Sequence, residues 1–215
     1  MGELILVRHG QANSGATSEA EYDRLSDLGH AQARLLGDWM RIHVDPFDLI
    51  LSGTMRRHRE TASGMGYPPK KFDERLNEME YFALARDMLV NHNIAPPVTS
   101  EDFVTHMPQT LAAWEQTTIT GAEPFATFES RINAALAEAA EPGKRVLCVT
   151  SGGVISMVMR SALDLGTAQM ANILLPIFNS SVHKFRIRPE GTFLSAFNAI
   201  PHLDTPELAD HRTHF

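Results

Sequence analysis

The chain has 215 residues, enough for one large domain or for one domain with a sizeable insertion. Its 19 Lys and Arg residues against 26 Asp and Glu give a formal net charge of −7, which argues against a broad basic face for nucleic acid or acidic lipid, so any anion must be bound locally. Cys148 is the single cysteine, which excludes an internal disulfide, and no apolar run reaches the roughly 18 residues of a membrane helix, so we expect a cytoplasmic protein without membrane or nucleic-acid partners.

Three short apolar runs that are rich in β-branched residues predict buried parallel strands. They lie at residues 4–7, 47–52 and 145–151. A helical pattern of apolar residues follows each strand, and Ser26 is placed to cap the first helix. These patterns cover residues 25–44, 54–66 and 153–165. Alternating strands and helices predict a doubly wound α/β domain.

The remaining segments extend this domain. Strands at 181–188 and 192–200 flank a Pro-Glu-Gly turn and predict an antiparallel hairpin at the sheet edge. Between about residues 81 and 121, prolines that include Pro108 separate short helical pieces, and this stretch is too short for a core of its own. We therefore expect a single domain over residues 1–215, a three-layer α/β/α sandwich with a mostly parallel sheet and a helical insertion. The polar tail from residue 201 is expected to be loosely held.

The segments that follow the three strands carry the candidate site, because ligands of an open parallel sheet bind beyond the carboxyl ends of its strands. Arg8 and His9 follow the first strand, and Arg57 lies shortly after the second. Ser151 and Gly152 follow the third strand and open a helix, whose free N–H groups and dipole favour an anion. A phosphoryl group is the ligand that this combination predicts.

The motifs VRHGQAN, YDRLSDLGHAQARLLG, RRHRETA and RLNE occur in this order along the chain. Together they resemble the histidine phosphatase superfamily, the phosphoglycerate mutase-like proteins. The resemblance implies that His9 is the nucleophile that takes the phosphoryl group, that Arg8 and Arg57 bind phosphate, and that Glu78 is the proton donor. It implies a phosphatase that hydrolyses a small phosphomonoester through a phosphohistidine, with no metal or organic cofactor, because arginines supply the positive charge.

Several assignments have rivals. A shift of one residue would exchange Arg57 for Arg56, which we expect to be a solvated helix charge. Glu80 competes with Glu78 as the proton donor. Asn13 and Ser14 are candidates for binding the phosphate, although they could merely turn the chain. The tail histidines at positions 211 and 214 have helical spacing but no further ligands, so we predict no metal site.

One position departs from the family pattern. The motif after the third strand normally reads Ser-His-Gly-Gly, whereas here Ser151 occupies the place of the second histidine. Loss of a donor that can carry positive charge typically costs about a hundredfold or more in rate. Three hypotheses follow: a weaker phosphatase or one tuned to activated esters, a phosphate-binding pseudoenzyme, or compensation by another histidine. The candidates for compensation are His183 and His58, for which we expect strand-surface and helix-surface positions.

Mutase activity on phosphoglycerate would need extra cations around the pocket. Arg86 is the only Lys or Arg between residues 81 and 130, and Phe82-Ala83-Leu84 stands where the family has a Trp-Glu-Gly signature. The same region offers several apolar residues, among them Phe103 and Met107, which suit an apolar or amphipathic leaving group or simply pack the insertion onto the domain. A phosphomonoesterase is therefore preferred over a mutase. The sequence leaves the substrate open, and it leaves a homodimer open as well.

Overall fold

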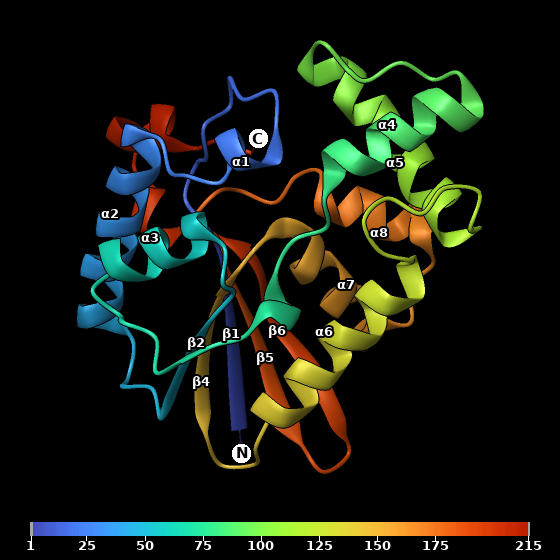
Figure 1. Cartoon of the computed structure of the whole chain (residues 1–215). Coiled ribbons are helices and arrows are strands. Elements are labelled where there is room, and N and C mark those ends of the chain that lie inside the picture. Colours follow the sequence, from blue (N-terminus) through green and yellow to red (C-terminus); the bar gives the residue numbers. More distant parts are fainter. Residues whose placement is uncertain (1, 215) are drawn as a thin grey trace.

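The computed structural model describes residues 2–214 (Figure 1). Over that range the chain forms a six-stranded sheet in the order β3-β2-β4-β1-β5-β6. The strands are Gly2–Arg8 (β1), Leu49–Ser52 (β2), Lys71–Phe72 (β3), Arg145–Thr150 (β4), Val182–Arg188 (β5) and Gly191–Ala199 (β6). Strands β1 to β4 pair in parallel, and β5 and β6 form an antiparallel hairpin at one edge. The predicted mostly parallel sheet is confirmed.

Helices cover both faces of the sheet (Figure 1). On one face lie α2 (Asp27–His43) and α3 (Arg56–Gly64), and on the other α6 (Phe125–Ala139), α7 (Gly152–Leu163) and α8 (Thr167–Leu174). The short α1 (Glu19–Tyr22), α4 (Tyr81–His92) and α5 (Ser100–Glu115) lie above the carboxyl ends of the strands. Short 3₁₀ helices are η1 (Glu74–Leu76), η2 (Pro201–Leu203) and η3 (Pro206–His211). The chain has the predicted α/β fold with three layers.

Side chains of β1 explain why the sheet is buried on both faces. Successive residues of a strand point to opposite sides, and here Leu4 and Leu6 join the core under α6, α7 and α8. Ile5 and Val7 join the separate core under α2 and α3. At the start of α2 the Ser26 hydroxyl accepts a hydrogen bond from the Gly29 N–H at 3.1 Å, which is the predicted N-cap.

Two expectations about local structure were wrong. Pro108 lies inside α5 instead of ending a helical piece, because its neighbours Met107 and Leu111 are buried and hold the helix against the core. The C-terminal tail is fixed to the domain, since the Gln32 amide donates to the His211 carbonyl at 2.7 Å and to Thr213 Oγ1 at 3.0 Å. No helix within residues 2–214 is both long enough and apolar enough to span a membrane.

Candidate active site

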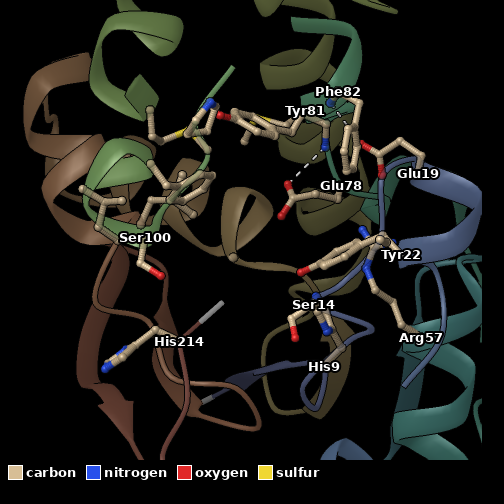
Figure 2. Close-up of a pocket in the computed structure, with 18 of the residues that line it drawn as sticks. His9, Ser14, Glu19, Tyr22, Arg57, Glu78, Tyr81, Phe82, Ser100 and His214 are labelled. Atoms are coloured by element: carbon tan, nitrogen blue, oxygen red, sulfur yellow. Dashed lines mark hydrogen bonds between the residues drawn. The ribbon is translucent and has the colours of Figure 1, made fainter. Parts of the chain in front are cut away.

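A cavity of about 380 Å³ lies at the carboxyl ends of β1 and β4. Its floor includes Arg8, His9 and Gly152, and α1 and α3 contribute one wall. The opposite wall comes from α4, α5 and α8, whose residues there are mostly apolar. Figure 2 shows Glu78, Tyr22 and His9 around one opening. Segments that are far apart in the sequence therefore meet where the parallel strands end, as the rule for open sheets predicts.

The His9 ring is held in one tautomer. Its Nδ1 lies 2.7 Å from the Gly10 carbonyl oxygen, which only accepts, so Nδ1 carries the proton and Nε2 keeps its lone pair. The side chain is buried, and burial, together with the charges of Arg57 and Arg8, holds the pKa of His9 well below its usual value of 6.5. A neutral imidazole with an unprotonated Nε2 is the nucleophilic form of histidine.

The depressed pKa of His9 gives a testable result in solution. A base whose pKa is lowered stays neutral as the pH falls through 6.5 and takes up a proton only at more acidic pH. An NMR titration of the free protein in buffer without phosphate should show the His9 ring still neutral once the pH has fallen below 6.5. The His9→Gln variant identifies the signal by its loss, and a midpoint near 6.5 would contradict the burial argument.

Arg8 and Arg57 supply buried positive charge. Arg57 is 1% exposed, with Nη1 3.1 Å from Asp23 Oδ1 and its guanidinium 5.1 Å from the centroid of the Tyr22 ring. Arg8 donates from Nη1 to the Ile177 carbonyl. Within residues 2–214, the Nε of each arginine has no hydrogen-bond partner. Buried N–H groups without an acceptor are costly, and an anion in the cavity would satisfy donors of this kind.

The position of Arg57 separates it from its neighbours. Arg56 and Arg59 are exposed, as expected for solvated helix charges, and neither lines the cavity. The structure therefore brings Arg57 to the site and leaves Arg56 outside it.

Glu78 is fixed at the rim of the cavity by backbone donors. Its Oε2 accepts from the Gly153 N–H at 2.8 Å and its Oε1 from its neighbour Met79 at 3.1 Å. A Cβ on Gly153 would lie 2.1 Å from Glu78 Oε1, so a larger residue there would displace the Glu78 carboxylate from this position. Glu80 is exposed, precedes α4 without a side-chain capping hydrogen bond and does not line the cavity.

The remaining predicted residues fall partly inside and partly outside the cavity. The Asn13 amide donates to the Glu21 carbonyl at 3.1 Å, and it is Ser14 that lines the cavity. Gly152 lines the cavity, whereas the buried Ser151 hydroxyl contacts a histidine, His58.

The two histidines considered for compensation were wrongly expected at the surface. His58 and His183 are both fully buried, and His183 contacts the Ser181 hydroxyl at 2.9 Å and does not line the cavity. The run RRHR contains no apolar residue, so it has no hydrophobic periodicity that would mark the buried face of the helix. The burial of His58 could therefore not be predicted from the sequence.

Sequence reasoning did not assign to the site several residues that line the cavity, among them Glu19, Tyr22 and His214. Tyr22 is the first residue of the motif YDRLSDLG, so its place in the motif could have drawn attention to it. Glu19 lies outside the motifs, and no feature of the sequence pointed to it. Burial raises the pKa of Glu19 against the opposing effect of Arg57. His214 stacks on Phe178 with 4.0 Å between ring centroids. Within residues 2–214 no group of three or more His, Cys, Asp or Glu side chains could hold a metal ion.

Comparison with known proteins places the chain in a family. The family model described as histidine phosphatase superfamily (branch 1) matches residues 4–200. The chain belongs to this superfamily. No match was found among curated proteins.

Similar solved structures support the same fold. A phosphoserine phosphatase mutant from Entamoeba histolytica, in complex with phosphoserine, has a TM-score of 0.70 at 18% identity, covering 94% of this chain and 100% of that one. A putative α-ribazole-5′-phosphate phosphatase from Escherichia coli has a TM-score of 0.66 at 21% identity, covering 92% and 96%. A mycobacterial glucosyl-3-phosphoglycerate phosphatase, in complex with VO₃, has a TM-score of 0.64 at 25% identity, covering 92% and 98%.

Proposed function

We propose that this protein is a phosphomonoesterase that hydrolyses its substrate through a phosphohistidine on His9. The observation that carries the proposal is the unprotonated Nε2 of a buried His9 beside Arg8 and Arg57, in a cavity large enough for a small ester. The family match and three similar structures that bear the names of phosphatases support it.

Each residue has a defined part in the reaction. His9 Nε2 attacks phosphorus while the bond from phosphorus to the ester oxygen breaks, and Glu78 gives its proton to that oxygen. In the second half, Glu78 takes a proton from water, the water oxygen bonds to phosphorus, and the bond from phosphorus to Nε2 breaks. Arg8 and Arg57 bind the phosphoryl oxygens and stabilise the charge that develops on them.

The opposite wall of the cavity indicates the class of leaving group. It includes the side chains of Phe82, Val98, Phe103, Met107 and Leu174. Among the described residues that line the cavity, Arg8 and Arg57 are the only Lys or Arg; Arg8 lies at the floor and Arg57 on the wall formed by α1 and α3. The two arginines therefore supply enough positive charge to bind one phosphoryl group, and the rest of the substrate contacts an apolar surface. We infer that the substrate is a singly phosphorylated apolar or aromatic alcohol.

A turnover assay with two phosphate esters tests this function. Phenyl phosphate should be hydrolysed with a kcat/KM at least tenfold above that for 3-phosphoglycerate, because the carboxylate of the latter finds no cation on the apolar wall. Rapid quenching with ³²P-labelled substrate should trap a phosphoenzyme that is stable to base and labile to acid, as a phosphoramidate is. Binding of phosphate without turnover of either ester would instead identify a pseudoenzyme, and transfer between phosphoglycerates would identify a mutase.

A further inference from the structure

A buried pair of side chains lies beside His9 and has no part in the reaction described above. Nε2 of His58, in the first turn of α3, lies 2.6 Å from Oγ of Ser151, and both residues are fully buried. The His58 ring also packs against the ring of His9, with 5.8 Å between centroids. The pair therefore connects α3 to the start of α7 directly next to the nucleophile.

The register of the sheet brings Ser151 next to His9. In the parallel pairing of β1 with β4, Arg8 lies opposite Thr150, and the His9 N–H donates to the Thr150 carbonyl at 2.9 Å. His9 and Ser151 are thus the next residues along two adjacent strands. The Ser151 hydroxyl makes no capping hydrogen bond to α7, although serine at a helix N-cap normally does so. Its neighbour Gly152 lines the cavity.

Gly53 makes room for the imidazole. A Cβ at Gly53 would lie 2.2 Å from His58 Nδ1, so no other residue type fits beside this ring without a shift. The same Nδ1 has no hydrogen-bond partner among residues 2–214. Burial and the charge of Arg57 hold the pKa of His58 well below 6.5, so the ring is neutral and carries one proton.

The position of that proton decides what Ser151 does. Buried N–H groups without an acceptor are rarer than unfilled acceptors, which assigns the proton to Nε2 and leaves Nδ1 as the unpaired acceptor. His58 then donates to Ser151 Oγ, and the serine proton is directed away from His58. A hydroxyl that is fixed in this way is a donor whose orientation is settled before the reaction begins.

We propose that His58 is a positioning residue that directs the Ser151 hydroxyl, as a hydrogen-bond donor, to the phosphoryl group on its way to and from His9. The proposal rests on the proposed function, since it needs a phosphoryl group at His9. In this arrangement the imidazole of His58, which lies on α3, influences the phosphoryl group through Ser151, which follows β4. The serine hydroxyl makes the contact with the phosphoryl group. No charged imidazole is required, because Arg8 and Arg57 already supply positive charge.

A double-mutant cycle tests the proposal. Ser151→Ala should lower kcat for phenyl phosphate about a hundredfold, the usual cost of one lost donor to the transition state. His58→Ala should lower kcat by a similar factor, and the double variant should lose no more than Ser151→Ala alone, because His58 acts through Ser151. His58→Gln keeps an N–H near the position of Nε2 and should retain kcat within about threefold of wild type. Affinity for orthovanadate, measured by calorimetry, should fall with kcat, while affinity for phosphate changes much less.

His202 provides a matched control. Its Nε2 lies 2.8 Å from the Ser180 hydroxyl, and its Nδ1 also lacks a partner among residues 2–214. His202→Gln should change thermal stability but neither kcat nor orthovanadate affinity.

Three results would overturn the proposal. If the fold-losses in kcat of the two single variants multiply in the double variant, His58 and Ser151 act independently. A greater loss of kcat for His58→Ala than for Ser151→Ala would show that His58 contacts the phosphoryl group itself. Unchanged orthovanadate affinity in Ser151→Ala would show a structural role only. Orthovanadate binding needs no turnover, so the affinity measurements still test the proposal if the wild-type protein is inactive. Inactivity of the wild-type protein would overturn the proposed function separately. Ser151→Ala and His58→Gln keep the test open if His58→Ala does not fold.

Discussion

The His9→Gln variant is expected to lose at least about 10³-fold in kcat for phenyl phosphate, since removal of a covalent nucleophile takes away the whole two-step route. Glutamine occupies similar space but offers no basic nitrogen to phosphorus. Arg8 and Arg57 remain in place, so affinity for inorganic phosphate should stay within about threefold of wild type. Steady-state kinetics and calorimetry measure the two quantities, and no phosphoenzyme should be trapped.

An exposed histidine serves as the control for this experiment. His43→Gln, at the last residue of α2, changes the same residue type far from the cavity lining and should leave kcat unchanged. Substantial turnover by the His9→Gln variant would show that another group attacks phosphorus. A loss of phosphate affinity equal to the loss of kcat would show that the variant had damaged the anion site instead of the chemistry.

The sheet could be predicted from sequence because its strands carry a local signal. Residues 4–7 and 146–149 are apolar throughout, and only a strand buried on both faces requires that pattern over so short a run. Ser26 marked the start of α2 through capping chemistry that is equally local. Pro108 shows the limit of local signals, because tertiary packing of α5 outweighs the cost of a proline inside a helix.

The candidate site could be predicted only in part. Identifying a strand is enough to place the residue at its carboxyl end, so His9 and Ser151 could be assigned to one edge from sequence. The partner of Ser151 could not be found in this way, because the contact with His58 joins residues 93 positions apart and depends on the space at Gly53. From the sequence, Ser151 was expected to mark the loss of a second histidine, yet an imidazole lies 2.6 Å from its hydroxyl.

Glu19 shows a second limit of the sequence-based interpretation. The choice of a proton donor weighed Glu78 against Glu80, two neighbours in one motif, whereas the cavity brings Glu78 together with Glu19 from α1. Both carboxylates lie in the lining, and burial raises the pKa of Glu19, which favours its protonated form. The experiment on the proton donor therefore has to separate Glu78 from Glu19 as well as from Glu80.

Three glutamine variants make this separation. Glu80→Gln alters an exposed carboxylate outside the cavity and should leave kcat unchanged. Glu19→Gln should lower kcat only slightly and by the same factor for every leaving group, because the charge of the cavity changes but the proton donor, Glu78, remains. A loss confined to poor leaving groups in Glu19→Gln, and absent in Glu78→Gln, would assign the proton transfer to Glu19.

Glu78→Gln itself should show a loss that depends strongly on the leaving group. Phenolate is a strong base and needs a proton as it departs, so turnover of phenyl phosphate should fall about 10³-fold, within the range of general acid catalysis. The 4-nitrophenolate ion is a much weaker base and leaves without help, so 4-nitrophenyl phosphate should lose less than about tenfold in the step that forms the phosphoenzyme. Single-turnover kinetics with the two esters isolate that step from the later attack of water, in which Glu78 also takes part. Because the glutamine amide can still accept from the Gly153 N–H, the rim of the cavity stays intact, and equal losses with both esters would contradict the role of Glu78 as the acid.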